Sequence, residues 1–195
     1  GFAEMATLEF GCRVTGLTLS HEQLAWAQAR AERQGFAAQA EFVLRDYRDA
    51  RGQYDHIVSI EMIEAVGESY WPSYFAQLNA LLKPGGRAVV QAITIDDALF
   101  AHYRRDVDFI QRYVFPGGML PSPKVFHQQA QRAGLAVRGE LAFGLDYART
   151  LGEWLQRFNA RLDAVLAQGF DERFVRLWQF YLAYCEAGFR AGSTD

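Results

Sequence analysis

Residues 54–67 read YDHIVSIEMIEAVG, and this stretch decides the fold. Its first half, Tyr54 to Ile60, is mostly apolar and β-branched at its centre, which is typical of a strand covered on both faces of a parallel sheet. Glu61 and Glu64 follow directly. Because ligands of open α/β sheets bind at the carboxyl ends of the strands, we expect these carboxylates in the mouth of a site. The alternative is that they only cap or salt-bridge the following helix.

Expected strands and helices alternate on both sides of this stretch. Further strands are predicted at Arg13–Leu19, Ala40–Leu44, Arg87–Ile95 and Leu135–Phe143. Helices are predicted over residues 1–10, 20–35, 69–82, 97–113, 123–134, 150–168 and from 171 onward. This alternation at short spacing indicates an α/β protein with a parallel, doubly wound sheet.

Three of the predicted helices begin with a capping signal. The N-cap candidates are Ser20, Thr150 and Asp171. Ser20 and Thr150 are followed three residues later by Gln23 and Glu153, which is the spacing of a capping box. In the last helix aromatic side chains recur at helical spacing, a pattern that is more typical of a core than of a cofactor site.

Length and composition favour one globular domain. The chain has 195 residues, of which 50% are apolar, enough for one core. A net charge of −3 gives no reason to expect a nucleic-acid partner. Cys12 and Cys185 have no metal or redox spacing, which favours a reduced cytoplasmic protein without a metal site. No apolar run approaches the roughly 20 residues of a membrane span, and no signal peptide is visible.

Five motifs are informative in combination. They are VTGLTLSHEQ (14–23), IVSIEMIEAVG (57–67), LKPGG (82–86), YVFPGGMLPS (113–122) and DYARTL (146–151). Together they resemble the cyclopropane-fatty-acyl-phospholipid synthase family, which includes the mycolic acid cyclopropane synthases and uses S-adenosylmethionine. The LKPGG turn is general to methyltransferases, whereas the last two motifs are specific to this family.

The resemblance implies a Rossmann-like class I methyltransferase sheet with helices on both faces and added helices that form an acyl-chain pocket. Residues 1–195 are then a single S-adenosylmethionine-dependent methyltransferase domain, truncated at both ends. We expect the missing first strand to leave a gap in the sheet. We also expect weak cofactor binding and unpaired strand edges that favour a homodimer or a swapped assembly.

The resemblance also assigns cofactor-binding residues. The positions carried over are Gly1, Thr18, Leu19, Ser20, Gln23, Tyr47 and Arg48. Gly1 matches the last glycine of the family's cofactor loop. The residues from Thr18 to Gln23 would hold the ribose and methionine parts of S-adenosylmethionine, and Tyr47 and Arg48 would flank its adenine.

The catalytic residues implied by the resemblance are Glu64, Gln91 and Tyr147. In the family a buried bicarbonate acts as the base and is held by a glutamate, a histidine, a tyrosine and backbone groups. Glu64 and Tyr147 match the glutamate and the tyrosine, but Gln91 stands at the histidine position. A glutamine donates a hydrogen bond but carries no charge at neutral pH. Bicarbonate is therefore an expected second cofactor, with a pKa that differs from the value set by a histidine.

The implied reaction is methylene transfer from S-adenosylmethionine to the cis double bond of an unsaturated phospholipid acyl chain. An alkene attacks the sulfonium methyl directly, so the enzyme aligns the reactants, excludes water and stabilises a carbocation before a proton is lost and the ring closes. Aromatic faces suit the cation. The candidates are Tyr113, Phe115, Phe143, Tyr147 and Trp154, with core packing as the alternative for each.

Two other functions remain open from the sequence. One is a methyltransferase that acts on another lipid-like or small-molecule acceptor, and the other is a catalytically silent binding module. A nicotinamide dehydrogenase is disfavoured because the chain has no Gly-x-Gly-x-x-Gly unit. For the lipid reaction we expect a cytoplasmic protein in peripheral contact with the inner membrane surface, since nothing in the chain spans a membrane.

Overall fold

Four strands form two separate pairs in the computed structural model, which describes residues 1–195. The strands are β1 (Val14–Thr18), β2 (Ala40–Leu44), β3 (Tyr54–Ile60) and β4 (Leu82–Gln91). β1 pairs with β2, and β3 pairs with β4. The chain divides into two compact units, Gly1–Tyr54 and Asp55–Asp195, each of which contains one strand pair.

The first unit is a βαβ arrangement. Its helices are α1 (Phe2–Leu8), α2 (His21–Arg33) and the 3-10 helix η1 (Tyr47–Asp49). α2 connects the parallel strands β1 and β2, which pair from Val14 opposite Ala40 to Thr18 opposite Leu44. The predicted cap of α2 is confirmed, because Ser20 Oγ accepts a 3.1 Å hydrogen bond from the backbone N–H of Gln23.

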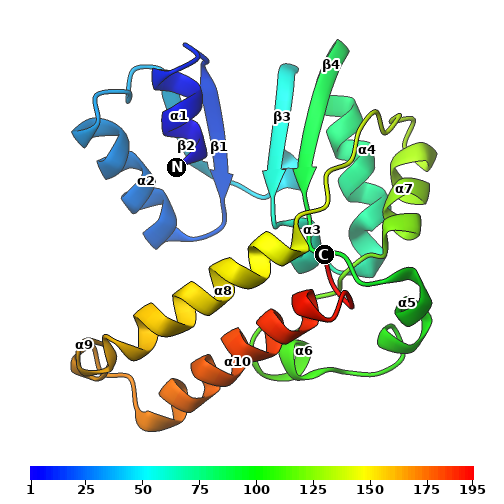
Figure 1. Ribbon diagram of the computed structural model, residues 1–195. Coiled ribbons are helices and arrows are strands. Elements are labelled where there is room, and N and C mark those ends of the chain that lie inside the picture. Colours follow the sequence, from blue (N-terminus) through cyan, green and yellow to red (C-terminus); the bar gives the residue numbers. More distant parts are fainter. The chain divides into compact units, whose positions relative to one another are not determined.

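The second unit surrounds β3 and β4 with helices. These are α3 (Ile63–Val66), η2 (Glu68–Tyr70), α4 (Trp71–Leu81), α5 (Asp97–Tyr103), α6 (Phe109–Tyr113), α7 (Pro123–Arg132), α8 (Gly144–Asn159), α9 (Leu162–Ala167) and α10 (Glu172–Arg190). Figure 1 shows the arrows of β3 and β4 pointing the same way, with α4 beside β4 and α7 packed on α4. The carboxyl ends of both strands therefore lie at one edge.

Aromatic side chains of α4 form the core beside β3. Trp71, Tyr74 and Phe75 are almost fully buried. The Tyr74 hydroxyl donates a 2.7 Å hydrogen bond to Ser59 Oγ, which ties α4 to β3. Phe75 meets Phe126 of α7 edge to face, with 5.0 Å between ring centroids. This core fixes the end of β3, from which the candidate site extends.

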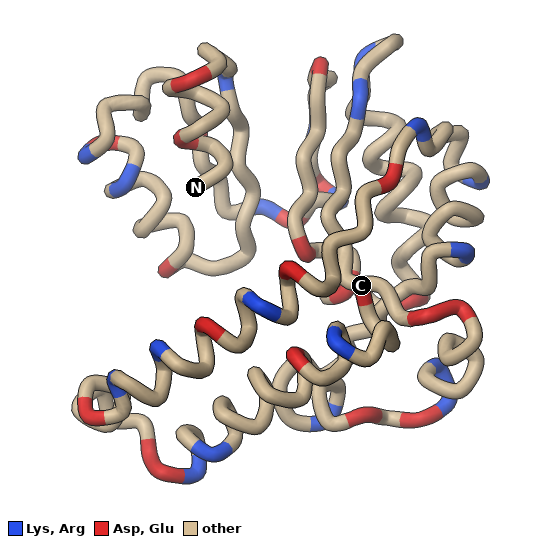
Figure 2. Tube along the Cα trace, viewed as in Figure 1, with Lys and Arg blue, Asp and Glu red and all other residues tan.

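The long helices α8 and α10 lie side by side (Figure 1). Their contact is built on a buried cluster of Ala148, Leu151, Leu182 and Phe189. Both helices carry acidic and basic residues (Figure 2), and their four ion pairs at helical i,i+4 spacing include Arg157 with Glu153 and Arg190 with Glu186. No helix has both the length and the apolar character that crossing a membrane requires.

The predicted strand Leu135–Phe143 is wrong. These residues have no regular secondary structure and no ladder partner, and Leu141 is 82% exposed. An alternating pattern makes a strand only where a neighbouring edge accepts its backbone hydrogen bonds. No such pairing forms in this segment, so it stays an extended connection to α8.

The predicted helix start at Thr150 is also wrong, because α8 begins at Gly144. Thr150 lies inside the helix, where its hydroxyl donates to the carbonyl of Asp146 at 3.1 Å. The start is instead capped from a distance: Asp195 Oδ1 accepts hydrogen bonds from the N–H groups of Phe143 and Gly144 at 3.1 and 2.6 Å. The predicted helix 150–168 is divided into α8 and α9.

Two other boundaries differ from the prediction. Helix 97–113 is divided into α5 and α6, because Asp108 and Gln111 form a capping box that starts a new helix. Strand β4 spans Leu82–Gln91 rather than the predicted Arg87–Ile95, so the predicted LKPGG turn lies within the strand. Beyond it, Ile95 forms an antiparallel bridge with Thr194, so this backbone is paired with the last residues of the chain.

Candidate active site

Side chains from two elements of the second unit, β4 and α8, converge on the carboxylate of Glu61. Gln91, at the end of β4, donates from Nε2 to Glu61 Oε1 over 3.1 Å. Tyr147, in the first turn of α8, donates from its hydroxyl to the same oxygen over 2.7 Å. The backbone N–H of Glu61 also donates to the Gln91 carbonyl at 2.9 Å. The carboxyl edge of β3 and β4 is therefore joined directly to α8.

The backbone of Glu61 has an unusual conformation. Its φ is +48°, and it is the only residue other than glycine with a positive φ in the structure. Side chains disfavour this left-handed region, and such outliers persist where the surrounding structure holds them. Here the hydrogen bonds from Gln91 and Tyr147 hold the side chain, so the conformation and the convergence of donors belong to one arrangement.

Glu64 lies beside this group but is held differently. It is in the first turn of α3, and its Oε1 accepts a 2.5 Å hydrogen bond from the backbone N–H of Ile93. Its Oε2 is buried without a hydrogen-bond partner. Burial raises the pKa of Glu64, the negative charge of Glu61 raises it further, and the Ile93 N–H opposes both. The protonated form of Glu64 is therefore favoured more than in a solvated glutamate.

The predicted loop motif at 115–122 supports Glu64 from its backbone. The N–H of Met119 donates to the Glu64 carbonyl at 2.8 Å. Gln111 donates from Nε2 to the Gly118 carbonyl at 3.0 Å, and the Leu120 N–H donates to the Tyr103 hydroxyl at 3.3 Å. A Cβ at Gly118 would lie 3.0 Å from the Phe115 carbonyl, so the tight turn requires a small residue there. The loop thus packs against α3 and fixes the residue that carries the buried carboxyl.

Aromatic rings surround the donor from α8. The Tyr147 ring lies 4.8 Å from Phe189 and 6.3 Å from Trp154, measured between centroids. Burial raises the pKa of Tyr147, and the hydrogen bond to Glu61 raises it further, so its hydroxyl stays a proton donor. Burial also raises the pKa of Tyr181 to about 12, and the Glu61 charge contributes to that shift.

The five aromatic residues predicted to stabilise a cation do not all lie at the Glu61 site. Tyr147 is in the site, Trp154 packs on it, and Phe115 lies 6.1 Å from Tyr181 between ring centroids. Tyr113 packs on Phe109 instead, at 5.7 Å. Phe143 precedes α8 and is 40% exposed. Their role towards a cation stays a prediction.

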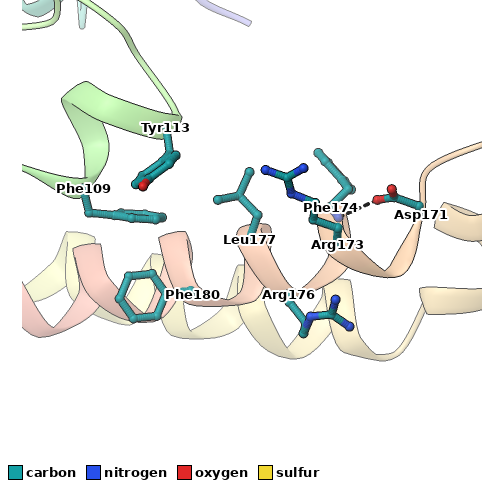
Figure 3. Close-up of a pocket in the computed structure, with 8 residues that line it drawn as sticks. All are labelled: Phe109, Tyr113, Asp171, Arg173, Phe174, Arg176, Leu177 and Phe180. Carbon is teal, nitrogen blue, oxygen red and sulfur yellow. Dashed lines mark hydrogen bonds between the residues drawn. The ribbon is translucent and has the colours of Figure 1, made fainter.

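Two open apolar grooves lie along α10. The larger, about 530 Å³, is lined by Phe109 and Tyr113 of α6 and by a stretch of α10 with its N-cap Asp171 (Figure 3). The second, about 290 Å³, lies between α8 and α10 and is lined by Trp154, Arg157, Phe158, Trp178, Tyr181 and Leu182. Trp154, which lines the second groove, packs on Tyr147 of the Glu61 site.

The residues predicted to bind S-adenosylmethionine lie in the first unit. Thr18 ends β1, and its hydroxyl donates to Gln23 Oε1 at 2.8 Å and accepts from the Ser20 N–H at 3.1 Å. Leu19, between them, is 72% exposed. The structure therefore brings Thr18, Ser20 and Gln23 together in one hydrogen-bonded group at the carboxyl end of β1.

Tyr47 and Arg48 follow the neighbouring strand. They form η1 directly after β2, and Asp46 holds the Arg48 side chain through hydrogen bonds of 2.9 and 2.7 Å. Since β1 and β2 are parallel and paired, both groups lie at one sheet edge. Gly1 is not part of the Thr18 group; it is the N-cap of α1. The binding roles of all seven residues stay predictions.

The sequence did not assign a role to Glu61, on which the donors converge. The available signal in the sequence was the position of Glu61 directly after the predicted strand 54–60, which placed it at the site mouth beside Glu64. Nothing local indicated that the expected bicarbonate ligands Gln91 and Tyr147 both donate to Glu61.

Bicarbonate does not fit this arrangement well. The Tyr147 hydroxyl and one N–H of Gln91 are already donated to Glu61, and the Glu64 oxygen that is bonded accepts from Ile93. None of the ion pairs in the structure includes Glu61 or Glu64, so no cation compensates the two carboxyls. An anion bound beside Glu61 would be repelled by its carboxylate.

The sequence and the fold were compared with known proteins. The family model described as mycolic acid cyclopropane synthetase matches residues 1–195. Tuberculostearic acid methyltransferase UfaA1 of Mycobacterium tuberculosis is 45% identical over 186 residues, which is 95% of this chain and 44% of the relative. Cyclopropane-fatty-acyl-phospholipid synthase of Escherichia coli is 34% identical over 194 residues, 98% of this chain and 47% of the relative. The chain thus spans about half the length of these relatives.

Solved structures agree with this relationship. The cyclopropane synthase MmaA2 of Mycobacterium tuberculosis superposes with a TM-score of 0.91 and 25% identity, covering 99% of this chain and 70% of that one. The mycolic acid cyclopropane synthase CmaA1, complexed with SAH and CTAB, superposes with a TM-score of 0.90 and 25% identity, again covering 99% of this chain and 70% of that one. The predicted α/β class I methyltransferase fold is therefore confirmed. On these grounds the chain belongs to the mycolic acid cyclopropane synthetase family.

Proposed function

We propose that this protein transfers a methyl-derived carbon from S-adenosylmethionine to the cis double bond of an unsaturated phospholipid acyl chain and forms a cyclopropane ring. The observation that carries the proposal is the convergence of Gln91 and Tyr147 on Glu61 next to an apolar groove. Membership of the family supports the same reaction. We further propose that residues 1–195 form part of one methyltransferase domain.

S-adenosylmethionine, when bound, supplies an electrophilic methyl group. The residues at the carboxyl edge of β1 and β2 fit such a cofactor. Gln23 is exposed, and only its Oε1 is engaged by Thr18, so its amide N–H groups are available to a polar ligand. Arg48 is held in place by Asp46, and Tyr47 offers an aromatic face beside it for a flat base. We assign the ribose and methionine parts to the Thr18–Gln23 group and the adenine to Tyr47 and Arg48.

The residues around Glu61 have three tasks in this proposal. The groove along Trp154 and Tyr181 holds the acyl chain by burying its apolar surface. Tyr147 presents an aromatic face to the cation that forms when the alkene attacks the methyl carbon. A carboxyl at the end of β3 lies where the proton of the added carbon must be accepted.

A methylated acyl chain without a ring is the second candidate product. It is favoured by one comparison, since the relative with 45% identity is named a methyltransferase. Other lipid-like acceptors and a silent binding module are weaker alternatives. For either lipid reaction we place the protein in the cytoplasm, in peripheral contact with the inner membrane surface. The substrate chain lies in a membrane, and no helix is long and apolar enough to cross one.

The experiment uses protein expressed from its complete gene, incubated with S-adenosylmethionine and vesicles of cis-monounsaturated phospholipid. The acyl chains are then analysed by mass spectrometry before and after catalytic hydrogenation. A chain that is heavier by one methylene and resists hydrogenation supports the ring. A chain that is heavier but takes up hydrogen supports methyl addition without closure. An unchanged chain, with cofactor binding intact by calorimetry, contradicts the lipid proposal.

A further inference from the structure

The two oxygens of the Glu61 carboxylate are held differently. Glu61 Oε1 receives both available donors, from Gln91 at 3.1 Å and from Tyr147 at 2.7 Å. Its second oxygen, Oε2, accepts no hydrogen bond, and the side chain is exposed at the site mouth. One oxygen is thus anchored and the other is free to take a proton.

The alternative bases are less suitable. Glu64 has one oxygen bonded to the Ile93 N–H and the other buried, so neither faces an open site. A bicarbonate would need the hydroxyl of Tyr147 and the amide of Gln91, which Glu61 occupies. It would also add a negative charge beside two carboxyls that no Lys, Arg or His pairs with.

We propose that Glu61 is the catalytic base and that its carboxylate takes the place of a bound bicarbonate in this protein. The inference rests on the proposed function. In the step, the alkene electron pair forms a bond to the methyl carbon while the carbon–sulfur pair leaves with sulfur. Glu61 Oε2 then removes a proton from the added carbon, and the electron pair of that C–H bond closes the ring. Gln91 and Tyr147 are positioning residues that hold the other oxygen.

Two substitutions at Glu61 distinguish this base from bicarbonate. Glu61→Gln keeps the shape and removes the proton acceptor. Glu61→Gly removes the side chain and frees both donors, and glycine tolerates the positive φ of +48° at this position. The matched control is Glu153→Gln, an exposed carboxyl of α8 that pairs only with Arg149 and Arg157. Circular dichroism checks the fold of each variant.

The assay measures transfer of isotope from labelled S-adenosylmethionine into phospholipid, in buffer freed of carbon dioxide and in buffer with added bicarbonate. We expect the wild type and Glu153→Gln to keep their rates without bicarbonate. We expect both Glu61 variants to lose about 10²–10⁴-fold, the usual contribution of a general base. Added bicarbonate should restore Glu61→Gly but not Glu61→Gln, whose amide fills the space. A wild type that loses activity without bicarbonate, or a Glu61→Gln variant with full activity, overturns the proposal.

A binding measurement separates this inference from the proposed function. Carbon-13 NMR of labelled bicarbonate is recorded with each protein in the absence of lipid. We expect no bound anion in the wild type and binding by Glu61→Gly; a bound anion in the wild type overturns the inference. If the wild type transfers no label to lipid in either buffer, the proposed function fails, and the NMR result still decides whether Glu61 occupies the anion position.

Discussion

The hydroxyl of Tyr147 donates a 2.7 Å hydrogen bond to Oε1 of Glu61, although 86 positions separate the two residues. This contact joins the start of α8 to the carboxyl end of β3. Because α8 also packs on α10, the contact links the aromatic groove to the carboxyl edge of the strand pair.

Tyr147→Phe should lower the rate of methyl transfer with little change in structure, because it removes the hydroxyl and keeps the ring. A hydrogen bond to a charged group is worth about 1.5–3 kcal/mol, which corresponds to a loss of about 10- to 100-fold in rate. Steady-state transfer to phospholipid measures the effect. Tyr54→Phe is the matched control, since its hydroxyl makes only a 3.3 Å contact with the Arg51 carbonyl. Equal rates for Tyr147→Phe and the wild type would contradict a positioning role.

Glu64 should make stability depend on pH. Burial raises its pKa above the ordinary 4.5, so the folded state binds its proton more tightly than the unfolded state does. The free energy of unfolding therefore falls as the pH rises from the ordinary pKa through the raised one. Glu64→Gln, which keeps an acceptor for the Ile93 N–H, removes this dependence.

Urea unfolding at about pH 5 and about pH 7.5 tests the Glu64 prediction. The variant should gain stability relative to the wild type at the higher pH. Glu153→Gln, at an exposed site, should show no such change with pH. A constant difference between Glu64→Gln and the wild type at both pH values would mean that Glu64 titrates normally.

Gln111→Ala should loosen the loop beneath Glu64. The substitution removes the side chain that completes the capping box with Asp108 and that donates to the Gly118 carbonyl. Loss of a cap costs about 0.5–2 kcal/mol. Urea unfolding measures the cost, and amide hydrogen exchange at Met119 reports the contact with Glu64. Gln128→Ala, on the exposed side of α7, is the control and should change neither the free energy of unfolding nor the hydrogen exchange at Met119.

The 195-residue chain should associate with itself. Its strands form two separate pairs, so each strand has an edge without a ladder partner, and a two-stranded sheet is marginally stable. Light scattering after size exclusion should show a mass that rises with concentration. A strict monomer at all concentrations would count against this expectation.

Local chemistry was sufficient for much of the fold. The caps at Ser20 and Asp171 were predicted from the sequence because each hydrogen bond closes within three residues. Strand β3 was predicted from its apolar, β-branched run, and Glu61 and Glu64 follow it as expected. The expected burial of β3 on both faces is wrong, since Val58 and Ile60 are 36% and 49% exposed. Motif similarity added the family, which the comparisons confirm.

The tertiary structure decided the features that depend on partners distant in sequence. Residues Leu135–Phe143 carry a strand-like pattern but pair with no edge, and α8 begins at Gly144 because Asp195 caps it from 51 positions away. The same holds for Glu61, whose donors come from 30 and 86 positions along the chain. A sequence determines which residues prefer a helix, a strand or a cap. Which donor meets which acceptor is decided only when packing brings their elements together.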